Sequence, residues 1–112
     1  MTSERQVWVT GIGLLSSHGE GVLAHAGLLD QSAAPPAIDG TRFAPWPVHS
    51  LVAFDAARFI PKASEQRQMG PWQRTGVHAA GLALADAGLL DRPDLLDRAD
   101  LVIAAGNGER DL

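Results

Sequence analysis

Two short apolar runs without polar alternation lie near the two ends of the chain. The first is Val7–Thr10 and the second is Leu101–Ala105, and each leads into a Gly-x-Gly tripeptide. A continuous apolar run of this length is typical of a strand that is covered on both faces, as in a parallel sheet. The sequence between them is helical in character. The pattern therefore predicts two central strands of one sheet in an α/β protein.

Weaker patterns fill the first half of the chain. Apolar positions at helical spacing predict a helix from about Gly21 to Asp30. Four prolines and a glycine make residues 31–47 a loop. Residues Val48–Phe54 could form a short edge strand, and Asp55 could cap a brief helical turn that runs through Phe59.

The clearest predicted helix begins at Pro71. Gly70 and Pro71 suit the cap and the first helical position, and Gly88 is placed to end the helix after about Ala87. Small residues dominate its interior: Gly76, Ala79, Ala80, Gly81, Ala83, Ala85 and Ala87. Because glycine costs up to about 1 kcal/mol inside a helix, such a composition indicates close backbone packing that compensates. Few polar groups follow His78, so the helix is expected to be buried on most sides.

Composition narrows the possible functions. The chain has 112 residues and a net charge of −4, with no run of basic residues, which gives no indication of nucleic-acid binding or of an anionic membrane partner. It contains no cysteine, which excludes a disulfide framework, a thiolate metal site and a cysteine nucleophile within these residues. No apolar stretch reaches the roughly 20 residues of a bilayer span, and the polar N-terminus is unlike a signal peptide, so a cytoplasmic location is expected.

Three ordered blocks resemble a known family. The first, residues 7–19, reads VWVTGIGLLSSHG and is similar to the opening of β-ketoacyl synthases, a hydrophobic strand followed by T-G-x-G-x-x-S-P-x-G. The second runs from Phe54 to Met69 and resembles the family segment that ends in R-x-M; the helix after it closes with ALADAGL at residues 83–89, similar to the family's A-L-x-D-A-G-L. The third, residues 101–108, resembles the family strand that ends in G-x-G.

The resemblance implies a specific fold and chemistry. Ketosynthases have a layered, thiolase-like αβαβα fold with a mostly parallel sheet, and they usually form dimers. They join an acyl thioester to a malonyl unit on acyl carrier protein in fatty acid and polyketide biosynthesis. A cysteine takes the acyl chain, and two histidines assist decarboxylation and stabilise the oxyanion. In the family these three residues lie beyond the stretch that this chain resembles, so residues 1–112 are expected to be an N-terminal fragment with no catalytic, cofactor-binding or metal-binding residue of its own.

Departures from the family pattern keep other functions open. Ser17 stands at the usual proline, Gln31 begins a segment at the usual G-x-S-G turn, and Glu109 follows the last G-x-G. The parent could be an active condensing enzyme or a non-catalytic subunit like a chain-length factor, in a homodimer or heterodimer. A small free-standing α/β interaction module is a third possibility. A cysteine and two histidines downstream would distinguish the first from the second.

Several residue clusters invite other functions but have simpler explanations. Gly11-Ile12-Gly13 follows a predicted strand, but Ser16 occupies the third glycine position of a dinucleotide-binding loop. Ser16 and Ser17 lack the G-x-S-x-G elbow of a serine nucleophile, so their hydroxyls are expected to bind loop backbone. Four aspartates interleaved with arginines lack a calcium-loop pattern and predict a solvated, self-paired turn: Asp91, Asp94, Asp97 and Asp100.

The remaining histidines and the tryptophans also favour structural roles. His78 lies on an apolar helix without a partner at ligand spacing and is expected to be a packed or hydrogen-bonded histidine. His25 and His49 belong to no recognisable pattern. Trp8, Trp46 and Trp72 are expected to be core or interface anchors, with Trp46 the best candidate for an interface.

Overall fold

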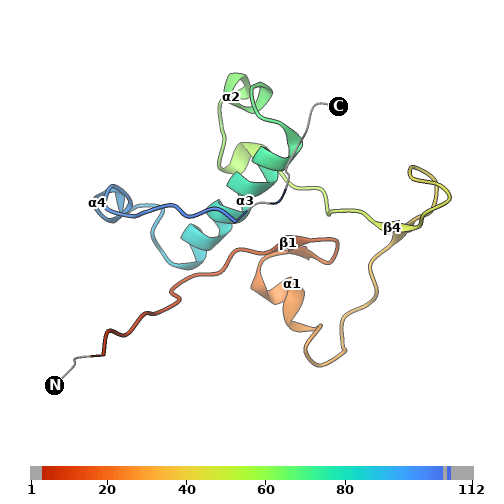
Figure 1. Ribbon diagram of the computed structural model, residues 1–112, viewed down its shortest axis with the longest axis horizontal. Coiled ribbons are helices and arrows are strands. Elements are labelled where there is room, and N and C mark those ends of the chain that lie inside the picture. The colour runs from red at the N-terminus through yellow and green to blue at the C-terminus, as the bar shows by residue number, and fades with distance from the viewer. Residues whose placement is uncertain (1–3, 105, 107–112) are drawn as a thin grey trace.

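The structure, a computed structural model, describes residues 4–104 and residue 106. Its centre is the helix α3, Pro71–Asp86, and the other elements lie around it as short pieces joined by long connections (Figure 1). The remaining helical elements are α1 (Val22–Ala26), the 3-10 turn η1 (Ala56–Arg58), α2 (Ala63–Arg67) and α4 (Pro93–Leu96).

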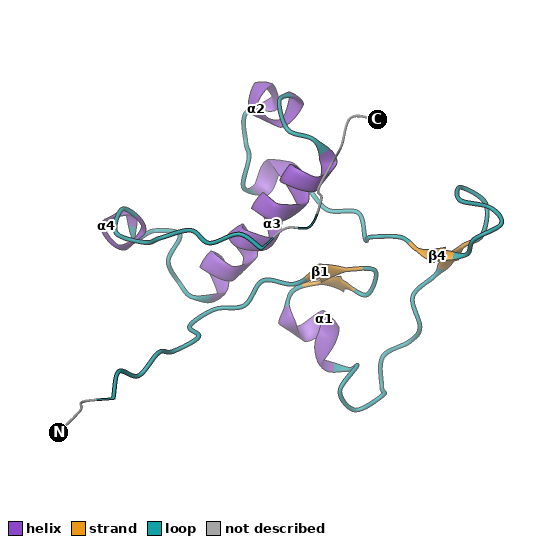
Figure 2. Cartoon of the chain, viewed as in Figure 1, coloured by secondary structure: helices purple, strands orange, loops and turns teal. Residues whose placement is uncertain are grey.

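Two separate two-stranded sheets accompany the helices (Figure 2). In the first, β1 (Leu15–Ser16) pairs antiparallel with β2 (Gly19–Glu20). In the second, β3 (Ile38–Asp39) pairs antiparallel with β4 (Val48–His49) and forms an arm that projects from the rest of the chain (Figure 1). The described residues are therefore mixed α and β, with antiparallel pairing in both small sheets.

The two predicted central strands are not formed. Residues 7–10 and 101–104 have no strand pairing, although their side chains are strongly apolar; Ala105 lies outside the described residues. A strand exists only where a neighbouring backbone accepts and donates its hydrogen bonds. Among residues 4–104, neither residues 7–10 nor residues 101–104 have such a neighbour, so the β-favouring sequence alone does not produce a sheet.

Other predicted elements are present but shorter. The helix expected over residues 21–30 is regular only in α1, and the edge strand expected over residues 48–54 is limited to β4. The Asp55 cap is confirmed, since its carboxylate accepts a hydrogen bond of 3.0 Å from the Ala57 N–H at the start of η1.

The predicted limits of α3 are confirmed by its two ends. At the start, the Gly70 N–H donates to the Gln73 side-chain oxygen at 2.9 Å, and Pro71 occupies the first helical position. At the end, Gly88 has φ of 72°, a left-handed conformation that favours glycine and turns the chain away from the helix axis.

The segment containing Gly11 and Gly13 packs directly on the backbone of α3. A Cβ atom at Gly13 would overlap the Ala79 carbonyl oxygen and lie 2.6 Å from the Ala83 nitrogen. A Cβ atom at Gly11 would overlap the Ala83 carbonyl oxygen and lie 2.7 Å from the Ala87 Cβ. The alanines recur every four residues and so share one face of the helix. Close packing is thus the physical reason for both glycines and for this stripe of small residues.

The expectation that α3 is buried on most sides is wrong for this structure. Only His78, Gly81 and Leu82 are buried along it, and Ile60 completes a very small core. Gly81 leaves room for the Phe59 ring, whereas Gly76 faces open space. The radius of gyration is 17.3 Å, compared with about 13 Å for a packed chain of this length. The rest of the helix is therefore half-buried or exposed.

We predict that Gly13→Ala destabilises the chain and that Gly76→Ala does not. The first change places a methyl group against helix backbone, which cannot rotate away, and should cost about 1–3 kcal/mol. The second adds a methyl group in open space within the same helix and should be neutral or stabilising by up to about 1 kcal/mol. Urea unfolding followed by circular dichroism measures both. Equal effects of the two substitutions would contradict the packing described above.

Candidate functional site

A charged cluster joins three segments around His78. Its Nε2 lies 3.0 Å from one oxygen of Glu20 on β2, and the other oxygen of Glu20 lies 3.1 Å from the Arg58 guanidinium on η1. His78 is only 2% exposed, while Glu20 and Arg58 reach solvent. Because a carboxylate only accepts hydrogen bonds, His78 Nε2 carries the proton in this contact.

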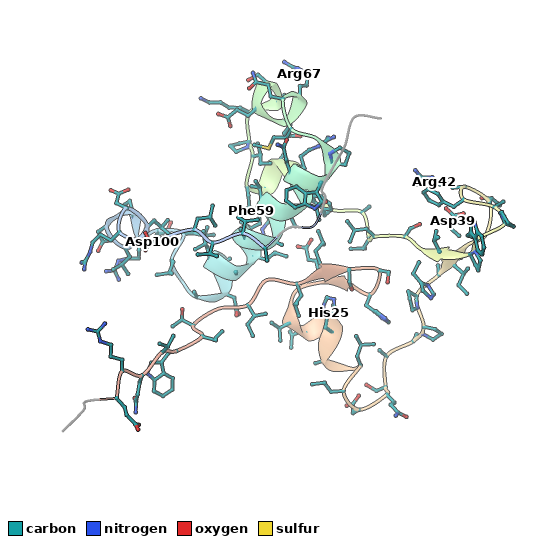
Figure 3. All side chains as sticks on the ribbon, in the orientation of Figure 1. His25, Asp39, Arg42, Phe59, Arg67 and Asp100 are labelled. Carbon is teal, nitrogen blue, oxygen red and sulfur yellow. The ribbon has the colours of Figure 1, made fainter. Side chains whose placement is uncertain are left out.

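Aromatic rings enclose the imidazole of His78. Phe54 packs at a ring-centroid distance of 4.6 Å and Phe59 lies edge-on at 5.2 Å. Figure 3 shows Phe59 beside α3, and the Arg58 guanidinium covers its ring at 4.9 Å. The Nδ1 atom of His78 is buried and has no hydrogen-bond partner among the described residues. The sequence-based expectation of a packed, hydrogen-bonded histidine is therefore confirmed at Nε2.

A second polar cluster lies on the β1–β2 hairpin and α1. The Ser16 hydroxyl oxygen is 2.6 Å from His25 Nε2, and His25 Nδ1 is 2.7 Å from the Gly21 carbonyl oxygen. The His18 backbone N–H donates to the same hydroxyl oxygen at 3.0 Å. Figure 3 shows His25 between α1 and the hairpin. The expectation that the Ser16 hydroxyl binds loop backbone is confirmed by the His18 contact, but His25, which had no recognisable pattern, is a second partner.

The Gly11-Ile12-Gly13 tripeptide has a packing role. Its glycines face the backbone of α3, and the Ile12 N–H donates to the Asp86 carboxylate at 2.9 Å. A phosphate-binding loop would direct its N–H groups at the ligand from the start of a helix. Here the glycines lie against the last turns of a helix, so the geometry does not support nucleotide binding.

The aspartate-rich segment is a surface turn. Asp94, in α4, receives two hydrogen bonds from the Arg92 guanidinium, of 3.1 and 3.0 Å, and both side chains are exposed. These bonds lower the pKa of the Asp94 carboxyl. The predicted pairing of aspartates with the interleaved arginines is thus confirmed for Arg92 and Asp94. Within the part of the chain that the structure describes, no three His, Cys, Asp or Glu side chains gather as metal ligands.

The other aromatic and histidine candidates lie at the surface. Trp8 and Trp46 are mostly exposed and Trp72 is about half exposed, so none of the three is a core anchor. His49 is exposed on the arm, where it faces a shallow groove of about 450 Å³. The groove is lined by Arg42, Phe43, Val48, His49, Ser50 and Leu51. An open surface of this kind gives little enclosure for a small ligand.

The sequence pattern indicates neither cluster, because the members of each cluster come together only after the chain has turned. Glu20 and His78 are 58 positions apart, and no motif relates them. Ser16 and His25 are nine positions apart, a spacing that brings them together only because a hairpin and then a helix follow Ser16. The signal that could have indicated the second pair is the Gly19–Gly21 turn immediately before a helical pattern.

Comparison with protein families, with curated proteins and with solved structures gives no match to this chain. Separately, no helix in residues 4–104 has the length and apolar character that a membrane crossing requires. Any assignment of function therefore depends on the residues and contacts described above.

We predict that His78→Ala destabilises the chain by about 3 kcal/mol, because it removes a buried ring and leaves a cavity between Phe54 and Phe59. Glu20→Gln should cost less, about 1 kcal/mol, since its carboxylate is partly exposed. His49→Ala is the control and should stay within about 0.5 kcal/mol of the unmodified chain. Thermal and urea unfolding measure all three, and a His78→Ala effect no larger than that of His49→Ala would show that the cluster does not stabilise the fold.

Proposed function

We propose that this chain is the N-terminal part of a β-ketoacyl synthase-like protein of fatty acid or polyketide biosynthesis. In this proposal the complete protein joins acyl and malonyl thioesters on acyl carrier protein, and these residues form part of its layered α/β body. The cysteine and the two histidines of the reaction belong to polypeptide outside residues 1–112. The proposal rests on the residue resemblance, and three features of the structure support it.

The contact between two family-like blocks is the observation that carries the proposal. The T-G-x-G block supplies Gly11, Ile12 and Gly13, and the A-L-x-D-A-G-L block supplies Ala83, Asp86 and Ala87. The glycines pack on the alanines, and the Ile12 N–H donates to the Asp86 carboxylate. Residues that are dispersed in sequence but resemble one family therefore meet in space. Each block therefore depends on the other, because the glycines of the first need the small alanines of the second for this close contact.

Exposed apolar surface is the second supporting feature. The side chains of Val7, Trp8 and Val9 are 76–92% exposed, and those of Leu101, Val102 and Ile103 are 65–91% exposed. Two β-favouring runs of this kind are unfavourable in water and can pair with other chains. In the proposed body they would be central strands of one sheet, covered by helices on both faces. The proposal thus explains the exposure of both runs, because the sheet and helices that would cover them belong to the larger body.

The small core is the third supporting feature. The described residues bury only Ile60, Leu82 and His78 among their large side chains. The exposed surface of the chain is 9428 Å², whereas a packed monomer of 11.8 kDa exposes about 5,900 Å². In this proposal, further polypeptide buries the difference. A ketosynthase-like body would supply it, with a mostly parallel sheet between α3 and further helices.

We predict that the 112-residue chain alone forms no β-ketoacyl product from acyl and malonyl carrier-protein thioesters. It contains no cysteine, so it cannot hold the acyl chain as an enzyme thioester. The complete product of the reading frame that encodes these residues should form the product and carry the acyl group on a cysteine outside residues 1–112. Mass spectrometry of intact protein and product detects both.

Two outcomes of that assay would contradict the proposal. Steady turnover by the 112-residue chain would place the reaction within these residues. A complete product that neither binds acyl carrier protein nor acts on its thioesters would remove the family assignment altogether. A complete product that binds the carrier protein but lacks the cysteine would instead identify a non-catalytic subunit.

A further inference from the structure

The hydrogen bonds around Ser16 have one consistent direction. His25 Nδ1 lies 2.7 Å from the Gly21 carbonyl oxygen, which can only accept, so Nδ1 carries a proton. In the neutral imidazole Nε2 is then an acceptor, and it lies 2.6 Å from the Ser16 hydroxyl oxygen. That oxygen already accepts from the His18 N–H, so the hydroxyl proton is available to His25. Ser16 donates to His25, and His25 donates to Gly21.

A hydroxyl, an imidazole and a carbonyl oxygen linked in this order can activate the hydroxyl as a nucleophile. A serine nucleophile needs a base within hydrogen-bond reach and a third group that fixes the tautomer of the base. Here Ser16 is the hydroxyl, His25 the base, and the Gly21 carbonyl the orienting acceptor. Both residues are partly exposed. We propose that Ser16 is a nucleophile that takes an acyl group from an activated ester or thioester, with His25 as its general base.

The backbone around the pair is held by separate contacts. Ser16 pairs with Gly19 across the hairpin, and its carbonyl oxygen accepts from the Val52 N–H at 3.2 Å. The Gly21 N–H donates to the Leu14 carbonyl oxygen at 2.8 Å, which closes the hairpin immediately before α1. His25 lies in α1, where a side chain four residues after Gly21 faces the Gly21 carbonyl oxygen. The two side chains are therefore oriented by structure that surrounds them.

The proposed step balances as an acyl transfer. The Ser16 oxygen attacks the acyl carbonyl carbon and forms a new C–O bond, while its proton passes to His25 Nε2. The bond from the acyl carbon to the leaving alkoxide or thiolate breaks, and the leaving group takes the proton from His25. The products are O-acyl-Ser16 and a free alcohol or thiol. No carbon–carbon bond forms, so this step is distinct from condensation and does not rest on the proposed function.

The reactivity is expected to be stoichiometric. The His18 N–H donates to the Ser16 hydroxyl oxygen, which is the nucleophile itself, so it is not free to bind an oxyanion. The contacts therefore assign a nucleophile and a base but no donor for the oxyanion. An acyl donor with a good leaving group compensates for this weak stabilisation of the oxyanion. Ser16 would be a site of single acylation by reactive acyl donors.

The test uses 4-nitrophenyl acetate and the full 112-residue chain. Peptide mapping should find one acetyl group on Ser16, formed at least tenfold faster than in the same chain unfolded in guanidinium chloride. Ser16→Ala should remove this modification, and His25→Gln should slow it by about a hundredfold, the usual contribution of a general base. Ser17→Ala is the matched control, since it removes the adjacent hydroxyl of the same turn, and it should leave Ser16 acetylation unchanged.

A second variant separates loss of the nucleophile from loss of local structure. Ser16→Cys keeps a nucleophile at the same position and should restore acylation, in a manner that again depends on His25. Acetylation of Ser16 no faster than in guanidinium chloride would overturn the proposal, and so would a rate that His25→Gln leaves unchanged. Modification confined to Lys62 or the N-terminal amine would overturn it as well.

Discussion

The close approach of residues 11–13 to the backbone of α3 is the contact on which the rest of the structure depends. Glycine at positions 11 and 13 lets the incoming chain lie against Ala79, Ala83 and Ala87 without side chains between them. The hydrogen bond from the Ile12 N–H to Asp86 fixes this segment along the helix. The β1–β2 hairpin follows at once, so its position relative to α3 is determined here.

Both polar clusters follow from that position. Glu20, at the end of the hairpin, reaches His78 on α3 and Arg58 on η1, and thereby joins three segments that are distant in sequence. Ser16, on the preceding strand, meets His25 where the chain turns into α1. If the glycines could not approach the helix, Glu20 would not lie beside His78, and a buried imidazole would lose its acceptor. The packing of small residues thus organises the polar contacts.

The sequence predicts local features of this chain better than its sheet. The limits of α3, the Asp55 cap and the Arg92–Asp94 pair depend on residues close in sequence, and each is confirmed. The strands expected at residues 7–10 and 101–105 depend on partners that the pattern cannot supply, and the first run and residues 101–104 of the second are unpaired. For the same reason the expectation of a helix buried on most sides is wrong, since burial needs covering elements. The Glu20–His78 and Ser16–His25 pairs were missed because they form across turns.

We propose that the two exposed apolar runs form strands in the sheet of a larger body. Hydrogen exchange of the amides of residues 7–9 and 101–103 tests it most directly, in the 112-residue chain and in the complete product of its reading frame. Unpaired amides exchange readily, whereas amides within a central sheet open only with global unfolding. The account predicts fast exchange in the isolated chain and strong protection in the complete product. Equally fast exchange in both proteins would contradict it.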